Sequence, residues 1–538
     1  MDNAKLAERL EAFAALLDLN GSGYYTVRAY RRAAELIRSA PVDVATLVRT
    51  GRARELAGIG PGIEERLREL VDTGELAELK ELEAQALPEL VGVARLLGLS
   101  TKRMRALGHA LGIRTLAELR EAAAAGRVDS VTGIGPKTAA RIETGLADLA
   151  TARPRRGMLL NRARALVGEV AATLGGEPAG DPRRACDLST RFSVVVPSNS
   201  LLLGVEALPQ IVAVLERDER RVVGVTAEGY PIEVVATTPS SFGTELVRAT
   251  GSAEYVAGLG DLPDAATEEE LYRRLGLPFR PPELREIEAG EAPADLVELR
   301  DVRGELHAHT TASDGKATVE EMGRAALALG YEYLAICDHT RNVRVVPGLD
   351  ADDIRRQGEE IAAANEALAP FRILCGSECD ILPDGSLDLP DDVLAELEWV
   401  QISLHAGQRW GRGALTDRVV EAMRHAGSIK GSASCLSHPK GRILNHRPEN
   451  ALDLERVFEV SLESGVALEV NGLPDRLDLA AGHVREALVA GVKIVCSTDA
   501  HSVRGLGNMA LSVATARRGG ARRTDVLSAL ALDELLSG

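Results

Sequence analysis

The second half of the chain repeats one arrangement, in which a short apolar segment runs directly into a polar side chain that can bind a metal. After residue 300, the segments YLAICDH, FRILCGSE, WVQISLH, SCLSHP, VALEVNG and VKIVCSTDAH alternate with stretches of helical character. Strands that alternate with helices form parallel sheets, and over residues 300–538 this pattern predicts a parallel barrel. No other feature limits the possible folds of the chain so strongly.

The stretch HAHTTASDG, residues 307–315, begins a set of candidate ligands at the ends of these strands. His307 and His309 are two residues apart, so on a strand both side chains project from the same face. Barrel enzymes build their active sites at the carboxyl ends of the strands. Nine side chains at those ends are therefore candidate catalytic residues and metal ligands: His307, His309, Asp314, His339, Glu378, His405, His438, Asp499 and His501.

These nine residues offer more donor atoms than one ion uses, which indicates two or three divalent metal ions. Because imidazole and carboxylate groups are present without thiolate, the set suits Mn²⁺, Zn²⁺ or Fe²⁺. Histidine is concentrated in this region, since nine of the ten histidines lie beyond residue 300. We interpret His425, His446 and His483 as hydrogen-bonded structural residues because they lie away from the strand ends.

Two cationic residues follow one of the candidate ligands. In SHPKGR, Lys440 and Arg442 come directly after His438. Cationic side chains beside a metal site can hold the phosphate of a substrate. An ordinary surface turn would have the same composition, and both interpretations stay open at this point.

The first 150 residues read as short helices separated by glycine turns, and two stretches share a G-I-G turn that opens a helix. They are LAGIGPGIEERLREL at 56–70 and VTGIGPKTAARIETGL at 131–146. Glycine permits a tight turn and close approach of another backbone, and a helix N-terminus offers N–H donors to phosphate. This is the helix-hairpin-helix pattern, which binds nucleic-acid backbone without reading sequence. The candidate DNA-backbone contacts are Gly58, Gly60, Gly62, Gly133, Gly135 and Lys137.

The charge of the chain is divided unevenly. The formal net charge is −17, yet residues 1–200 hold 29 Lys and Arg against 25 Asp and Glu. An acidic total therefore conceals a basic region that suits DNA. Six scattered cysteines without a CxxC pair, and the lack of an apolar run of membrane-spanning length, predict a cytoplasmic, nucleoid-associated protein with no membrane partner.

The motifs HAHTTASDG, CDHT, GSE, SLH, SHPKGR and STDAH together resemble the PHP (polymerase and histidinol phosphatase) domain. Within it, HPKGRIL and EVNGLPDRLDL are similar to the PHP domain of bacterial family X DNA polymerases. The segment TEEELYRRLGLPFRPPELRE, at 267–286, resembles the same family just before the barrel. The resemblance implies a distorted (β/α)₇ barrel that holds three metals and hydrolyses phosphoesters.

The resemblance runs over nearly the whole chain and implies a multidomain protein. We expect an α-helical helix-hairpin-helix region, a small α/β nucleotidyltransferase-like palm whose strands include RFSVVV and YPIEVVA, and the PHP barrel. The expected domains are a lyase-like domain at 1–90, a second, fingers-like helix-hairpin-helix region at 91–150, the palm at 151–250, a shortened thumb-like segment and linker at 251–299, and the barrel at 300–538.

The polymerase motifs of the family are altered in this sequence. A family X polymerase needs three carboxylates to hold two Mg²⁺ ions. In AGDPRRACDLSTRFSVVV, Arg183 and Arg184 match the arginine pair of the family, but the carboxylate positions fall on Arg191 and Ser193, with Glu233 as the third. A guanidinium group at such a position repels Mg²⁺. We therefore expect a degenerate, inactive polymerase core.

The lyase motif is altered as well. The lysine that would form a Schiff base with an abasic sugar maps to Arg66 in GIEERL. Arginine stays protonated and cannot be that nucleophile. The N-terminal region is then expected to hold DNA without lyase chemistry of its own, or else to support the barrel as a fold alone.

The function that these observations favour is a metal-dependent phosphoesterase that acts on DNA. We expect a 3′–5′ exonuclease in DNA repair, with 3′ ends and gapped or damaged DNA as partners. Three alternatives stay open. A small-molecule phosphatase of the histidinol-phosphate type would use the same barrel but not the helix-hairpin-helix turns. A DNA-binding protein with structural metals would need no complete ligand set, and a working polymerase would require Arg191 and Ser193 to be compatible with metal binding.

Overall fold

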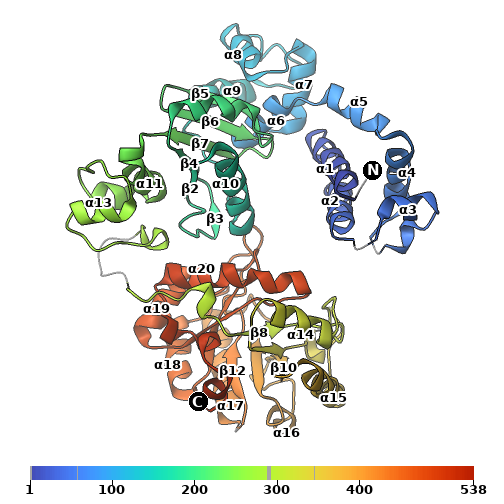
Figure 1. The fold of residues 1–538 in the computed structure, drawn as a ribbon, viewed down its shortest axis with the longest axis vertical. Coiled ribbons are helices and arrows are strands. Elements are labelled where there is room, and N and C mark those ends of the chain that lie inside the picture. Colours follow the sequence, from blue (N-terminus) through green and yellow to red (C-terminus); the bar gives the residue numbers. More distant parts are fainter. Residues whose placement is uncertain are drawn as a thin grey trace. The chain divides into compact units, whose positions relative to one another are not determined.

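The computed structural model describes residues 3–537 except 41, 57, 155, 287–292, 344–345 and 430. Part of the expected linker at 251–299 therefore lies outside the described residues. The chain divides into two compact units (Figure 1). The first unit comprises Met1–Arg155 and Asn199–Ala236, and the second comprises Arg156–Ser198 and Thr237–Gly538. Each unit is thus assembled from segments that are not contiguous in the sequence.

The second unit contains a seven-stranded parallel sheet whose strands follow one another in chain order (Figure 1). The strands are β8 (Gly304–Ala308), β9 (Tyr333–Ile336), β10 (Arg372–Asp380), β11 (Trp399–Ser403), β12 (Ala433–Leu436), β13 (Ala467–Asn471) and β14 (Ile494–Ser497). The two ends of the sheet meet, because Ala308 and Ala500 form a parallel bridge. The His309 amide donates to the Ala500 carbonyl at 2.9 Å. The predicted parallel barrel is confirmed.

Helices connect the strands and cover the outside of the barrel. They are α14 (Val319–Ala328), α15 (Ala351–Leu368), α16 (Asp391–Leu394), α17 (Arg412–Ser428), α18 (Leu454–Ser464), α19 (Ala481–Ala490), α20 (Met509–Gly519) and α21 (Leu532–Ser537). Two begin with a capping box, formed by Thr318 and Glu321 at α14 and by Asp350 and Asp353 at α15. These caps fix the residue at which the loops after β8 and β9 end.

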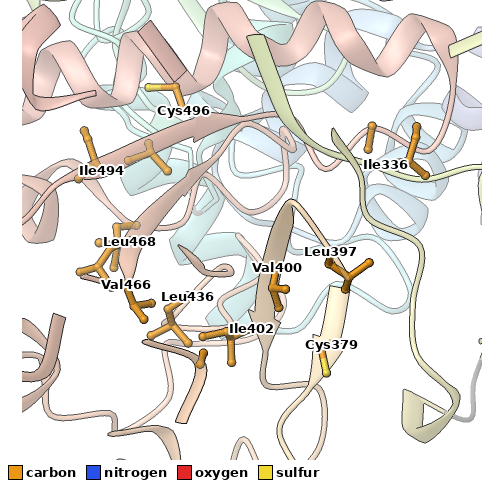
Figure 2. Packing of buried hydrophobic residues seen from close by; sticks show 14 of the residues in the cluster. Ile336, Cys379, Leu397, Val400, Ile402, Leu436, Val466, Leu468, Ile494 and Cys496 are labelled. Carbon is orange, nitrogen blue, oxygen red and sulfur yellow. The ribbon is translucent and has the colours of Figure 1, made fainter. Parts of the chain in front are cut away.

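The strands are buried on both faces, as their continuous apolar sequences require. Leu334 and Ile336 of β9 belong to a core cluster shared with the surrounding helices, whereas Tyr333 and Ala335 belong to a second cluster that reaches Leu535 of α21. Successive residues of a strand point to opposite faces, which explains the division. Figure 2 shows members of the first cluster, including Ile402, Leu436 and Leu468, on neighbouring strands.

The second unit also contains the segment that precedes the barrel in the sequence. Its elements are β1 (Met158–Leu159), α10 (Leu160–Leu174), β2 (Glu177–Gly180), β3 (Leu188–Ser189), β4 (Phe192–Val196), α11 (Phe242–Thr250), α12 (Ala253–Gly258) and α13 (Glu268–Arg274). Strands β2 and β4 pair antiparallel, and α10 packs on both. This is the mixed α/β character expected for the middle of the chain.

The first unit is mainly helical. Its helices are α1 (Asn3–Leu19), α2 (Tyr24–Ser39), α3 (Val44–Arg49), α4 (Pro61–Thr73), α5 (Ala77–Gln85), α6 (Pro88–Leu96), α7 (Thr101–Leu111), α8 (Leu116–Ala124) and α9 (Pro136–Ala147). An antiparallel meander of β5 (Ile211–Arg217), β6 (Arg221–Thr226) and β7 (Pro231–Ala236) completes it. Leu90 of α6 shares a core with Leu215 and Val223 of this meander. The helical N-terminal region predicted from the glycine turns is confirmed.

None of the helices among the described residues is long and apolar enough to cross a membrane. The six cysteines are all free thiols, and five of them are buried.

Candidate metal centre

The nine predicted ligands come together at the carboxyl ends of the barrel strands. Among the described residues, three overlapping groups have ligand atoms within 4.8 Å of one another. The groups are His309, Asp314, His339 and His501; His307, His309 and Glu378; and His339, Glu378 and His405. Because the groups share members, they form one continuous centre with room for more than one cation.

Glu378, at the end of β10, is the carboxylate at the middle of this centre. Its Oε2 lies 2.8 Å from Nδ1 of His339 and 3.6 Å from Nε2 of both His307 and His309. Its Oε1 lies 3.0 Å from Nε2 of His438, which joins that residue to the centre. A carboxylate whose two oxygens face different imidazoles can bridge two cations.

Asp499 and Asp314 join the remaining ligands. Asp499 Oδ1 lies 3.1 Å from Nε2 of His309. Asp314 Oδ2 lies 3.2 Å from Nε2 of His501. The structure therefore brings all nine predicted ligands to one place, although they are spread over the sequence from residue 307 to residue 501.

Several ligand atoms in this centre are buried and have no hydrogen-bond partner among the described residues. They are Nε2 of His307, Nδ1 of His309 and Nδ1 of His438, while Nδ1 of His339 and Oε2 of Glu378 lie 2.8 Å from each other. A buried polar atom without a partner costs free energy, and several facing one another need a common explanation. Divalent cations bound by nitrogen and oxygen donors provide it, so the residues present fit the metals that the sequence predicts.

The electrostatics of the centre favour the charged form of its carboxylates, whereas its imidazoles differ. Burial lowers the pKa of His307 and of His339, but Glu469 and Glu378, respectively, outweigh it and raise both pKa values. Burial raises the pKa of Glu378, but His339, His405 and His307 outweigh it and hold that pKa well below its ordinary value. Burial, helped by His339 and His501 and opposed by Asp499, lowers the pKa of His309 to about 4. A charged carboxylate and a neutral imidazole are the forms that bind a metal ion.

Glu469, in β13, contacts the candidate ligand His307 on the side away from Glu378, and it was not among the predicted site residues. Its Oε1 lies 2.6 Å from Nδ1 of the buried His307, and its Oε2 accepts a hydrogen bond from the His438 amide at 2.6 Å. Such an outer carboxylate fixes the ring so that the other nitrogen faces the metal. The signal was present in VALEVNG, the one predicted strand to which no ligand was assigned.

Two further aspartates support the centre, one by contacting a candidate ligand and the other by holding a loop. Asp380 Oδ1 lies 3.3 Å from Nδ1 of His405. Asp338 accepts hydrogen bonds from the Thr310 amide at 2.8 Å and from Nε2 of Gln357 at 2.5 Å, and so holds the start of the HAHTTASDG loop. Both aspartates are buried, and neither was among the predicted site residues.

Two ligands have a backbone conformation that non-glycine residues rarely adopt. The φ angles of His438 and Asp499 are +26° and +52°. Left-handed conformations cost free energy and persist where the surroundings fix them, often at functional sites. Both residues follow a strand directly, so the unusual turn directs their side chains to the centre.

The structure gives Lys440 and Arg442 partners within the protein. Both are buried, with Nζ of Lys440 donating to the Leu452 carbonyl at 3.1 Å. Arg442 donates to the Arg476 carbonyl at 2.9 Å and to Asp187 at 2.7 Å. These contacts place both cationic groups inside the protein, and their contact with a substrate phosphate stays a prediction.

Of the three histidines set aside as structural, two have carboxylate partners. Nε2 of His425 lies 2.9 Å from Asp391, and Nε2 of His483 lies 2.9 Å from Glu449. His446 lines a cavity beside the metal centre.

The glycine turns in the first unit expose their backbone. Gly58 and Gly133 have φ angles of +104° and +90°, and α4 and α9 begin just after Gly60 and Gly135 without a side-chain cap. A Cβ atom placed at any of the five predicted glycines, Gly58, Gly60, Gly62, Gly133 and Gly135, would meet nothing within 4 Å. Lys137 is exposed at the start of α9. The turns are therefore accessible to another molecule.

The polymerase-like positions are engaged in ion pairs. Arg183 contacts both carboxylate oxygens of Glu268 at 2.7 Å, and Arg184 contacts Asp181 at 2.7 Å and Glu286 at 2.9 Å. The other oxygen of Asp181 accepts from the amides of Thr190 and Arg191, at 2.7 and 2.8 Å. These carboxylates have no oxygen without a partner in the protein.

The remaining altered positions have partners too. Arg191 donates to the Gly251 carbonyl at 3.3 Å, and Glu233 pairs with Arg221 at 2.5 Å within the β6–β7 hairpin. Ser193 is buried in β4. Arg66, the altered lyase position, pairs with Glu78 at 2.5 Å and with Glu65 at 3.1 Å. Among the described residues, metal-ligand groups gather in the barrel and not at these positions.

Comparisons with known proteins agree with the geometry. Residues 305–472 match the PHP domain family, residues 1–76 match a helix-hairpin-helix domain, and residues 93–148 match a SAM-like helix-hairpin-helix tandem. The Bacillus subtilis protein named DNA polymerase/3′-5′ exonuclease PolX is 30% identical to the chain, over 99% of both lengths. A probable phosphatase of Acetivibrio thermocellus is 29% identical over 37% of the chain and 78% of its own length.

Proposed function

The chain belongs to the PolX family of bacterial DNA polymerase/3′–5′ exonucleases, and from that premise we propose that its barrel is a metal-dependent phosphoesterase that removes nucleotides from 3′ ends of DNA in repair. The observation that carries the proposal is the set of buried, mutually facing ligand atoms around Glu378. The substrates would be 3′ ends in gapped or damaged DNA.

The nine residues would hold two or three ions, with Mn²⁺, Zn²⁺ and Fe²⁺ as the candidates. When bound, divalent ions supply Lewis-acid activation of water and of the phosphoester. The residues of the chain supply position and charge. Glu469 and Asp380 orient the rings of His307 and His405. The barrel loops keep the remaining ligand atoms fixed before substrate arrives, so little reorganisation accompanies the reaction.

The helix-hairpin-helix turns would bind the DNA. Their open glycines and the exposed Lys137 offer backbone N–H donors and a cation to phosphate groups. Such contacts are independent of base sequence, as an enzyme that degrades any strand end requires. The basic balance of residues 1–200 supports this assignment.

The polymerase and lyase chemistries of the family would be absent from this chain. The arginine pair that matches the family is bound to Glu268, Asp181 and Glu286, and a cation stands at position 191. Arg66 cannot form a Schiff base. The protein would then be an exonuclease that uses a former polymerase as a scaffold.

A small-molecule phosphatase is the second candidate. The similarity to the probable phosphatase of A. thermocellus, over 37% of the chain, supports it. Phosphatase activity would need the barrel alone, and it would leave the helix-hairpin-helix turns without a role.

A gel assay tests the proposal. The protein and its His307→Ala variant are incubated with 5′-labelled primer–template DNA and Mn²⁺, with and without dNTPs, and His425→Ala serves as the control for loss of a histidine. We expect a ladder of shortened primer from the wild type and the control, and none from His307→Ala. Primer extension would contradict the loss of polymerase activity. An unchanged primer together with hydrolysis of histidinol phosphate would favour the phosphatase.

A further inference from the structure

A cavity of about 770 Å³ adjoins the metal centre. It lies between the loop after β11, residues 405–410, and residues 446–451, all within the second unit. His405 lines the cavity and is also a candidate metal ligand. A molecule in this cavity is therefore in position to present one end to the metal centre. The volume falls within the range of roughly 300–1,000 Å³ that is typical of ligand sites.

The lining combines an aromatic surface with cations. Trp410 is 39% exposed, in a chain with only two tryptophans. Arg409 is exposed in the same loop, and the half-buried Arg447 stands in the opposite one. Glu449 also lines the cavity, but its carboxylate lies 2.9 Å from Nε2 of His483 and 3.8 Å from the guanidinium of Arg442, which supplies an opposing charge. Aromatic rings beside basic groups are the combination that binds single-stranded nucleic acid.

The indole of Trp410 is held in place by a cation over one face of its ring. The guanidinium of Arg418 lies 5.1 Å from the ring centroid. Arg418 is itself fixed, because it donates to the carbonyls of Ala406 and Leu382 at 2.7 Å each. A cation over one face of an indole stabilises the ring in a defined orientation. Trp410 is thus an exposed aromatic side chain with a rigid position rather than a mobile one.

The two loops that form the cavity are tied together. The buried Asn450 donates to Oε1 of Gln408 at 2.8 Å and to the Pro439 carbonyl at 3.0 Å. Nε of Arg447 donates to the Gly441 carbonyl at 2.7 Å. These contacts hold the cavity open in the protein alone, so a ligand would not have to order the loops, and the cost of binding is reduced.

We propose that this cavity is the subsite for the terminal nucleotide of the strand that the barrel cuts, with the nucleobase stacked on Trp410 and the flanking phosphates near Arg409 and Arg447. The inference rests on the proposed exonuclease function and adds the residue that recognises the end of the strand. Stacking on a ring is tolerant of base identity, as removal of any nucleotide requires. A free mononucleotide carries the same chemistry, and the experiments separate the two sources.

A pair of substrates tests the stacking in the cutting reaction. One primer ends in a normal nucleotide, and the other ends in a tetrahydrofuran abasic residue that lacks a base. We expect Trp410→Ala to lower kcat/KM on the normal primer by about 5- to 150-fold, the fold-change that corresponds to a stacked base. It should leave the abasic primer unchanged, and Trp410→Phe should keep most of the wild-type rate. An equal loss on both primers, or no loss on either, would overturn the proposal.

A binding measurement tests the same cavity without catalysis. Trp399 is fully buried in the barrel, so Trp410 is the exposed fluorophore of the two tryptophans. We expect deoxyadenosine 5′-monophosphate to quench the wild-type emission in a saturable way, and deoxyribose 5-phosphate to leave it unchanged. The Trp410→Phe variant, which retains Trp399, should show no saturable quenching with either compound.

The two measurements separate failure of this inference from failure of the proposed function. Saturable quenching by the mononucleotide with no cutting of DNA would support the cavity as a nucleotide site while it contradicts the exonuclease. Cutting of DNA without quenching, and with an unaffected Trp410→Ala variant, would overturn the subsite and leave the exonuclease standing.

Discussion

The barrel centre and the polymerase-like segment both bring carboxylates and nitrogen groups within about 3 Å of one another. They differ in whether the buried polar atoms have hydrogen-bond partners within the protein. In the barrel, Nε2 of His307 and Nδ1 of His309 are buried without a hydrogen-bond partner among the described residues. In the polymerase-like segment, both oxygens of Asp181 and both of Glu268 have partners in the protein.

The chemical reason lies in the nitrogen groups. A neutral imidazole has a lone pair to give to a cation, whereas a guanidinium has five donors and no acceptor. Arginine beside these carboxylates therefore forms ion pairs in which every carboxylate oxygen has a partner. The imidazoles and carboxylates of the barrel leave donor atoms that suit a cation.

Removing the central carboxylate of the barrel should have the largest effect. Glu378→Gln takes away a charge that faces several imidazoles. Because Lewis-acid stabilisation amounts to several kcal/mol, we expect phosphoester hydrolysis to fall about 1,000-fold or more. The bound metal per chain, measured by elemental analysis, should fall as well. Glu366→Gln, on the exposed side of α15, is the control, and full metal content in Glu378→Gln would contradict the assignment.

The matching substitution in the polymerase-like segment should affect stability and not chemistry. Glu268→Gln removes the partner of Arg183 and of the fully buried Arg285. Breaking a buried ion pair leaves an uncompensated charge, so we expect the free energy of unfolding to fall by about 3 kcal/mol. Denaturant unfolding measures it, with the exposed neighbour Glu269→Gln as the control. A fall in metal content instead would remove the distinction between the two regions.

A smaller loss is expected when the orienting carboxylate is changed. Glu469→Gln keeps the size of the side chain but weakens its hold on Nδ1 of His307. Outer-shell substitutions of this kind typically cost ~10- to 100-fold in metal affinity or activity. Metal titration followed by calorimetry, with the exposed Glu459→Gln of α18 as a control, provides the test. An unchanged metal affinity and an unchanged rate would show that Glu469 does not orient His307.

Restoring carboxylates to the polymerase motif should have no effect on nucleotide addition. The double variant Arg191→Asp, Ser193→Asp supplies two missing charges, but Arg183 and Arg184 stay paired with Glu268, Asp181 and Glu286. We expect no incorporation of a labelled dNTP into primer–template DNA with Mg²⁺ or Mn²⁺. Incorporation would show that the ion pairs open easily and that the segment is closer to a working polymerase than the contacts indicate.

Local patterns in the sequence were sufficient to predict the barrel and to bring together the nine candidate ligands. Each candidate lies near the carboxyl end of an apolar strand or in the loop that follows it, and parallel strands in a barrel necessarily present their ends on one side. The outer contacts could not be predicted in the same way, because they join residues that are far apart. Glu469 is 162 residues from His307, and Asp187 is 255 residues from Arg442. The division of residues 151–250 between the two units also depends on long-range packing that no local pattern records.

The closure of the barrel between Ala308 and Ala500 determines when, during synthesis of the chain, the metal centre can be completed. His309 and Asp499, which lie side by side in the finished protein, are 190 residues apart in the chain. At ribosomal rates of ~5–20 residues per second, roughly 10 to 40 seconds pass between the synthesis of the first ligand and that of the last. During that interval the nascent chain has histidines but no complete centre. The full set of candidate ligands is therefore available only in the completed polypeptide, and a message cut short before β14 yields a product that lacks Asp499 and His501.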